Sequence, residues 1–324
     1  MKQAAPVDPP LNPYEPPGET SAAALAEGTP SLTSARLLVL AAALMWSSGG
    51  FFAKAHTFDG WPGPALAFWR AALACIVLLP LVRRVEWTWK LLPMATMFVL
   101  MNYSYLTAMV QGSAANAIWL QMTAPVWVLL VGVLVFGERA TWRDGLLVAF
   151  AAAGVGIILY YESQGESLSA VLWGLASGAF YAGIVLSLRQ LRTLDSSWLA
   201  AVNHVSTALA LAYFALGGLV DANSPTPFPA GIQWGFLAGF GILQLGLPYV
   251  LFARGLRSLP GHEAAGIGLV EPVLVPVWVY LAWGQKPAWW TLVGGGLILV
   301  GLVLRYLRLP AFGSPAGTGD KKGE

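Results

Sequence analysis

The chain has 324 residues, of which 57% are hydrophobic and only 10% charged, with a formal net charge of +2. So few charges cannot cover the surface of a water-soluble protein of this length, which excludes a soluble enzyme and a disordered chain. The balanced charge argues against nucleic acid as a partner, and Cys75, the single cysteine, excludes an intrachain disulfide or a cysteine-based metal motif. The composition indicates a polytopic membrane protein.

The two ends of the chain differ from the rest. Residues 1–34 contain seven prolines and scattered acids without apolar periodicity, which predicts a disordered N-terminal tail. A secretory signal would place a basic and then an apolar region at the very start, and this segment has neither. Residues 309–324 are predicted to form a flexible C-terminal tail.

Between the tails, apolar stretches follow one another with short polar links. Each stretch is long enough to cross a hydrocarbon core of about 30 Å as a helix. We therefore predict ten transmembrane helices. Their expected ranges are 36–56, 62–82, 90–110, 113–136, 143–161, 168–188, 197–220, 231–253, 263–283 and 288–307.

The distribution of Lys and Arg predicts the orientation, because short cytoplasmic loops of membrane proteins are enriched in these residues. With the N-terminus in the cytoplasm, the outer ends of the spans hold only Lys54 and Lys286. The inner ends then hold Arg36, Arg83, Arg84, Lys90, Arg139, Arg143, Arg189, Arg192, Arg254, Arg257, Arg305 and Arg308. This asymmetry supports ten helices with both termini in the cytoplasm.

The sequence also contains an internal repeat. A shift of 147 residues superposes the fourth and fifth predicted helices on the ninth and tenth, and it matches Pro125 with Pro272 and Gly137 with Gly284. The first helices match more weakly, with Trp46 and Lys54 set against Tyr181 and Arg189. Because each half has five helices, the second half must cross the membrane in the opposite sense. The predicted fold is an all-α integral membrane protein with two inverted five-helix repeats, residues 35–161 and 168–308.

Four segments together carry a family resemblance: "APVWVLLVGVLVFGE", "EPVLVPVWVYLAWGQ", "FWRAAL" around Arg70, and the first helix with Trp46 and Lys54. With these segments the chain resembles the EamA family of the drug/metabolite transporter superfamily. The resemblance implies a ten-helix carrier, mostly exporting metabolites or amino acids across a bacterial inner membrane. One position departs from the family pattern, since the acid that closes the motif is Glu138 in the first repeat but Gln285 in the second.

Two ionisable residues lie deep within predicted spans, Arg70 in the second helix and Glu271 in the ninth. A charge near the bilayer centre costs about 2.5 to 3.5 kcal/mol on insertion scales, so each needs a partner or a hydrated site. One interpretation is structural: the two residues pair, or each binds a neighbouring helix. The other is functional: Arg70 attracts a substrate carboxylate, and Glu271 binds an ammonium group or a coupling proton.

Neutral polar and aromatic residues within the spans extend this candidate substrate site. Such groups either bind a polar solute or hold helices together. For His204 the alternatives are a packed neutral imidazole and a proton relay, and for Trp46 they are core packing and stacking on a solute. The substrate-site candidates are Trp46, Arg70, Asn102, Tyr103, Gln121, His204, Gln244 and Glu271, with Asn116 and Asn203 as further buried amides.

Prolines and small residues complete the pattern. Pro125, Pro272 and Pro276 are predicted to kink their helices, either beside the substrate site or as plain packing features. Glycine-rich stretches in the fifth and tenth helices permit close helix contact and are interpreted as scaffold or as the surface of a homodimer.

The functional prediction is a secondary active transporter that moves a small polar metabolite or amino acid, with a proton as candidate coupling ion. It has no catalytic constellation, cofactor motif or metal motif. The alternative is a membrane scaffold or sensor that transports nothing.

Overall fold

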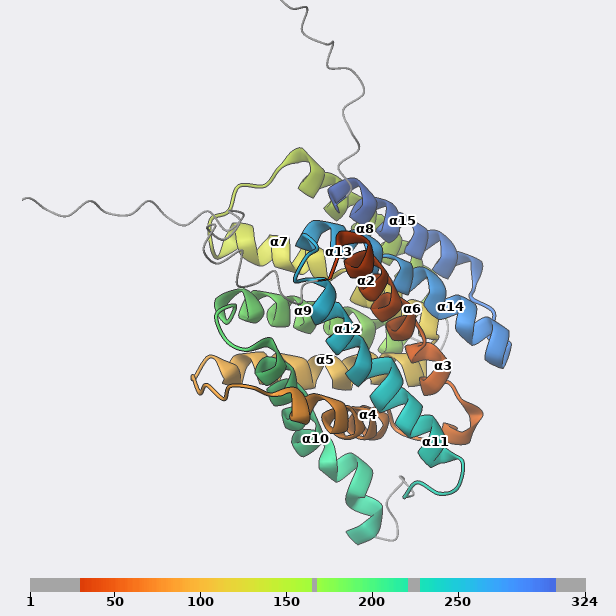
Figure 1. The fold of residues 1–324 in the computed structure, drawn as a ribbon. Helices are drawn as coiled ribbons and strands as arrows, with labels where there is room; N and C mark the ends of the chain where they lie inside the picture. Colours follow the sequence, from red (N-terminus) through yellow and green to blue (C-terminus); the bar gives the residue numbers. More distant parts are fainter. Residues whose placement is uncertain (1–29, 165–167, 221–227, 307–324) are drawn as a thin grey trace, which may run out of the picture.

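The computed structural model describes residues 30–164, 168–220 and 228–306, and these residues are helical without any strand (Figure 1). Ten spans in the described part are long and apolar enough to cross a membrane, as the sequence predicts. They comprise Leu32–Ala53, Gly63–Leu81, Leu91–Gln111, Ala114–Leu134, Trp142–Glu162, Leu168–Gln190, Ser196–Leu216, Gln233–Gly255, Glu263–Trp283 and Trp289–Tyr306.

The first helix begins earlier than predicted. Helix α2 starts at Leu32, because Ser31 is its N-cap and accepts a hydrogen bond from the Ser34 backbone N–H at 3.2 Å. The helix therefore includes residues 32–34, which the prediction from sequence assigned to the N-terminal tail. Residues 1–29 and the predicted tail 309–324 lie outside the described residues.

Four of the ten spans are interrupted. The first consists of α2 (Leu32–Ser47) and α3 (Gly49–Ala53), the fourth of α6 (Ala114–Gln121) and α7 (Ala124–Leu134). The ninth consists of α13 (Gly261–Gly268) and α14 (Val270–Trp283). The eighth contains the π-helix η3 between two α-helices; its parts are α11 (Gln233–Ala238), η3 (Gly239–Gly246) and α12 (Leu247–Gly255). The helices of the other six spans are α4 (Gly63–Leu78), α5 (Leu91–Gln111), α8 (Trp142–Glu162), α9 (Leu168–Gln190), α10 (Ser196–Val220) and α15 (Trp289–Tyr306).

The prolines stand at different places in these spans. Pro125 and Pro272 lie in the first turns of α7 and α14, directly after the interruptions. A proline is tolerated there because its missing N–H would have no partner within the first turn. Pro276 lies inside α14, which continues past it to Trp283.

The interruptions of the fourth and ninth spans occur at equivalent positions of the sequence repeat. The N-caps Ser113 and Pro260 of α6 and α13 are 147 residues apart, and so are the C-caps Met122 and Leu269 that end these helices. Gly137 and Gly284, again 147 apart, both have φ of 67°. This left-handed conformation favours glycine. The repeat is thus present in the backbone as well as in the sequence.

Helices α8 and α15 lie side by side along their whole length, and we call them the α8–α15 pair (Figure 1). A side chain added at Gly154 would collide with the carbonyl oxygen of Gly294, and one added at Gly294 would collide with Gly154. Close backbone contact of this kind is typical of small-residue helix interfaces in membranes. These two glycines of the predicted scaffold-or-dimer stripe therefore pack against each other within one chain.

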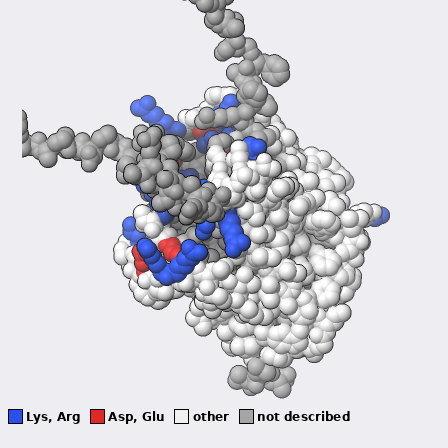
Figure 2. All heavy atoms as spheres, viewed as in Figure 1, with Lys and Arg blue, Asp and Glu red and all other residues white. Residues whose placement is uncertain are grey.

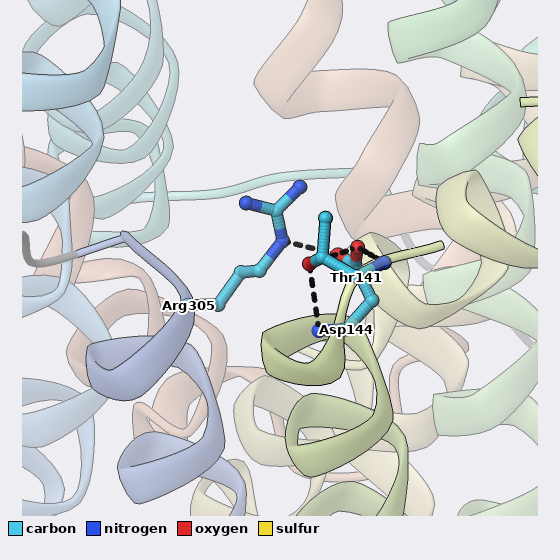
Figure 3. A network of polar contacts seen from close by, with 3 residues as sticks. All are labelled: Thr141, Asp144 and Arg305. Carbon is cyan, nitrogen blue, oxygen red and sulfur yellow. Dashed lines mark hydrogen bonds and ion pairs between the residues drawn. The ribbon is translucent and has the colours of Figure 1, made fainter. Parts of the chain in front are cut away.

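Polar contacts hold one end of this pair (Figure 3). Asp144 accepts hydrogen bonds from the backbone N–H and hydroxyl of Thr141, at 2.7 and 2.6 Å, in a capping box that starts α8. Its other carboxylate oxygen lies 2.5 Å from Nε of Arg305 near the end of α15. The same carboxylate therefore caps one helix and ties it to the other.

The opposite end of the pair has its own polar contacts. Glu162, the last residue of α8, accepts hydrogen bonds from Nε1 of Trp290 at 3.1 Å and from Nδ2 of Asn116 at 2.7 Å. The hydroxyl of Thr291 donates to Oδ1 of Asn116 at 2.8 Å. The pair is thus tied at both ends, and α6 is attached to it.

We call the end of the bundle where α2 begins the near end and the opposite end the far end. Lys and Arg atoms gather at one edge of the face shown in Figure 2, whereas the opposite edge is nearly free of them. The basic residues assigned by sequence to the inner ends, as far as the structure describes them, fall on the links of the near end, since the helices alternate in direction. This charge asymmetry agrees with the predicted alternation of ten spans.

Candidate functional site

Arg70 lies in the interior, in the middle of α4, with 4% of its surface exposed. Its Nη2 donates a hydrogen bond to Oδ1 of Asn102 on α5, while Nδ2 of Asn102 donates to the carbonyl of Phe98 at 2.9 Å. The second bond fixes the orientation of the amide, so that its oxygen faces the guanidinium. The guanidinium also lies over the ring of Phe240, 5.1 Å from its centroid. Asn102 thus positions Arg70.

Glu271 lies in the first turn of α14, just after the interruption of the ninth span, and is half-buried. Among the described residues, no acidic oxygen lies within 4.0 Å of the Arg70 nitrogens, so the direct Arg70–Glu271 pair weighed from the sequence is not formed in this structure. The two charges are near enough to interact electrostatically. Each is therefore left without a direct ionic partner.

Tyrosines from three helices lie within electrostatic reach of these charges. Tyr105 of α5 and Tyr249 of α12 are within electrostatic reach of both Arg70 and Glu271. Tyr181 of α9 is within reach of Glu271. Because these helices belong to both repeats, the charges lie where the repeats meet, as expected of a solute site in an inverted-repeat carrier.

Trp46 and Gln244 connect the first span with the eighth. Nε2 of Gln244, in the π-helix, donates to the carbonyl of Trp46 at 3.0 Å, and Oε1 of Gln244 is buried without a hydrogen-bond partner among the described residues. The ring of Trp46 packs edge-on against Tyr249, at 5.4 Å between centroids. Trp46 is half-buried, so its ring joins Tyr249 at the border of the site.

His204 lies one layer deeper, in α10. It is fully buried, its Nδ1 is 2.7 Å from the carbonyl oxygen of Ala200, and its ring packs on Tyr249 and Phe98 at 5.3 and 5.0 Å. In this structure its ring therefore forms part of the packing around Tyr249.

The remaining candidates are distributed over the interior. Tyr103 packs against Trp173 and Phe214, at 5.4 and 5.8 Å between centroids, and so joins α5 to α9 and α10. Gln121 is buried at the last residue of α6, directly before the interruption. Asn203 is buried in α10 with its Oδ1 unpartnered among the described residues. The structure therefore bonds Arg70 to Asn102 and Gln244 to Trp46, while the aromatic contacts of Tyr103 lie with Trp173 and Phe214.

Sequence reasoning missed Tyr105, Tyr181 and Tyr249. Tyr105 is three residues after Asn102, a spacing that places both on one helix face, so this signal was available. Tyr249 follows Gln244 by five residues, which would put them on different faces of an α-helix. In the structure both contact Trp46, Gln244 from the π-helix through the Trp46 carbonyl and Tyr249 from α12 through the ring. The sequence carries no clear signal of the π-helix or of this shared contact.

The chain matches known transporters along most of its length. The model of the EamA-like transporter family matches twice, over residues 33–160 and 168–307. A protein of Archaeoglobus fulgidus named as an uncharacterized transporter is 27% identical over 67% of this chain and 76% of its own length. The pseudopaline exporter CntI of Pseudomonas aeruginosa is 26% identical over 75% of this chain and 85% of its own length.

A solved crystal structure shares the fold. It superposes with a TM-score of 0.60 at 18% identity, over 86% of this chain and all of that chain. The ten apolar spans, the backbone repeat and the double family match lead to one conclusion. The chain belongs to the EamA-like transporter family, and it is a multi-pass membrane protein.

Proposed function

We propose that the protein is a secondary active transporter that exports a small polar metabolite or an amino acid by alternating access. The observation that supports this best is the separated charge pair at the centre, Arg70 and Glu271. Arg70 is 4% exposed and has no acidic partner within 4.0 Å among the described residues. An unpaired charge in the membrane interior is costly and is typical of a solute or ion pathway.

The chemistry of the two charges suggests how a solute binds. Arg70 offers a positive charge held in place by Asn102, which suits the carboxylate of a solute. Glu271 is half-buried and makes no hydrogen bond among the described residues, which suits an ammonium group or a proton. A zwitterion placed between them would neutralise both charges. We therefore infer amino-acid-like solutes as the first class to test, with a proton as the candidate coupling ion.

The proposed location is the bacterial inner membrane, with both termini in the cytoplasm and the near end facing the cytoplasm. The Lys and Arg asymmetry supports this orientation. The name of the Pseudomonas aeruginosa relative supports export as the direction. Reporter fusions after Arg84 and Arg192 should report the cytoplasm, and fusions after Glu162 and Asp221 should report the outside. A C-terminus found outside would contradict the orientation.

Three variants test the site: Arg70→Gln, Glu271→Gln and the double variant. If the charges bind solute, each single variant should lose at least about tenfold in flux, which corresponds to one charge-assisted hydrogen bond, while its melting temperature stays near that of the wild type. The double variant should also be inactive. The backbone carbonyl of Phe98 accepts the hydrogen bond from Asn102, and this contact does not involve the Phe98 side chain, so Phe98→Leu is a control variant beside Asn102.

The structural alternative gives the opposite pattern. If Arg70 and Glu271 formed a dry ion pair in the working protein, each single variant would strand a charge at a cost of about 3 to 5 kcal/mol and would fold poorly. The double variant would then recover folding and flux. Full flux by the double variant would overturn the proposed site.

A further inference from the structure

Two loops correspond to each other across the repeat. The far-end loop, residues 110–114, joins α5 to α6, and the near-end loop, residues 257–261, joins α12 to α13; they are 147 residues apart. The far-end loop contacts the start of α9. Oγ of Ser169 donates to Oε1 of Gln111 at 2.9 Å, and a side chain added at Gly112 would touch Cβ of Ala170.

The near-end loop makes the equivalent contacts with the start of the first span. Oγ of Ser258 donates to the carbonyl of Pro30 at 2.7 Å, and Leu259 packs in one buried cluster with Ala35. Ala35 precedes Ala170 by 135 residues, the offset that also relates Lys54 to Arg189. Each loop thus contacts the start of the first helix of the opposite repeat, so the two sets of contacts are equivalent.

A second set of contacts exists at the far end. Nζ of Lys54, just past α3, donates to the carbonyls of Gly112 at 2.7 Å and Val110 at 3.2 Å, where α5 ends. The end of a helix carries unpaired carbonyls and partial negative charge, which favours a cation. Oε1 of Gln285 accepts from the backbone N–H of Ala114 at 3.5 Å. Lys54 and Gln285 therefore hold the far-end loop from both sides.

Solvent access to Lys54 is restricted. Burial lowers the pKa of Lys54, and the charge of Asp59 offsets part of that effect. A desolvated ammonium group depends on its hydrogen-bond acceptors, so the two carbonyls replace lost water. Release of the loop would return this ammonium to water, which makes the contact reversible.

The near end lacks, among the described residues, the counterparts of the contacts that Lys54 and Gln285 make at the far end. The repeat places Arg189 where Lys54 stands and Glu138 where Gln285 stands. In the described residues, Arg189 approaches Glu138 at 4.0 Å and makes no hydrogen bond to the near-end loop, and both side chains are more than half exposed. In the described residues, the Lys54 contact therefore holds the far-end loop, whereas its counterpart is not formed at the near end, where Arg36 of α2 pairs with Glu263 of α13 instead.

We propose that Lys54 and Arg189 are the two gate residues of the transport cycle. In the state described, Lys54 closes the far end on the carbonyl of Gly112. In the opposite state Lys54 releases this loop, and Arg189 binds the carbonyl of Leu259, the equivalent position of the near-end loop, and closes the near end. This inference rests on the proposed alternating access, but it predicts conformations and needs no knowledge of the solute.

Distance measurements between spin labels test the gates on the full chain in lipid nanodiscs, in a Cys75→Ala background. One label pair, Asp59→Cys with Gln164→Cys, reports the far end, and a second, Arg192→Cys with Arg257→Cys, reports the near end. In Lys54→Gln the far-end pair should gain a longer distance and the near-end pair a shorter one. The population of molecules that show these new distances should rise about tenfold over the wild type, as expected for loss of a charged hydrogen bond.

Two further variants complete the test. Lys286→Gln removes an exposed lysine at the same end and should leave both distance distributions as in the wild type. Arg189→Gln should abolish the short near-end distance, which gives an independent arm if Lys54→Gln does not fold. Unchanged distributions in folded Lys54→Gln, or a short near-end distance that survives Arg189→Gln, would overturn the proposal. Shifted distances without solute flux would leave the gates standing and refute the transport proposal instead.

Discussion

The α8–α15 pair and the interrupted spans around Arg70 are built in opposite ways. The pair has continuous helices, a glycine contact in the middle and polar ties at both ends, through Asp144 with Arg305 and Glu162 with Trp290. The fourth and ninth spans are broken near the centre. The difference separates a rigid support from the parts that can move against it, because broken helices leave free backbone groups and weak points for bending.

The largest expected effect comes from separating the two helices of the α8–α15 pair. Gly154→Val should prevent stable folding, since its side chain has no room beside the carbonyl of Gly294. Monodisperse protein yield after extraction measures this. Gly156→Val is the matched control, because a side chain there meets nothing within 4 Å. Equal yields for the two variants would contradict the close contact.

A moderate effect is expected from the polar tie at the near end. Asp144→Asn weakens the capping box and the contact with Arg305, and should lower stability by about 1 to 2 kcal/mol, because Arg305 is partly exposed and can turn to solvent. A thermal melt measures the loss, and flux should persist at permissive temperature. Glu263→Gln, which removes an exposed ion pair with Arg36, serves as comparison and should change the melt less.

The smallest effect is expected outside both regions. Deletion of residues 2–29 removes neither an apolar span nor an ionisable residue within a span, so insertion and flux should match the full chain. Membrane fractionation and a flux assay check this expectation. Loss of inserted protein would show that the segment contributes to the fold.

The ten spans and much of the α8–α15 pair could be predicted from the sequence. Long apolar stretches specify the spans within a few residues, and the glycines in "AAAGVGIIL" and "LVGGGLILVG" indicate the close helix contact. The repeat of Pro125 and Pro272 also marked where the fourth and ninth spans are interrupted. These features depend on local composition and spacing, which a single sequence displays.

The site was predicted only in part. Arg70 and Glu271 stand out because charges are rare in apolar spans, but their separation depends on helix packing. Asn102 was predicted to line the site, and the structure shows it bonded to Arg70, a contact set by the rotation of α5 against α4. The contact of Tyr249 with Trp46 depends on how the eighth span packs against the first, which propensity does not reveal.

The central claim is that a solute with a carboxylate and an ammonium group is carried through the site of Arg70 and Glu271. The most direct test measures uptake of a panel of radiolabelled L-amino acids into proteoliposomes, with and without a pH gradient, for wild type and Arg70→Gln. We expect wild type to transport at least one of these amino acids, and to do so faster with the pH gradient, whereas Arg70→Gln should transport none. Equal uptake by the variant, or no uptake of any of them by folded wild-type protein, would contradict it.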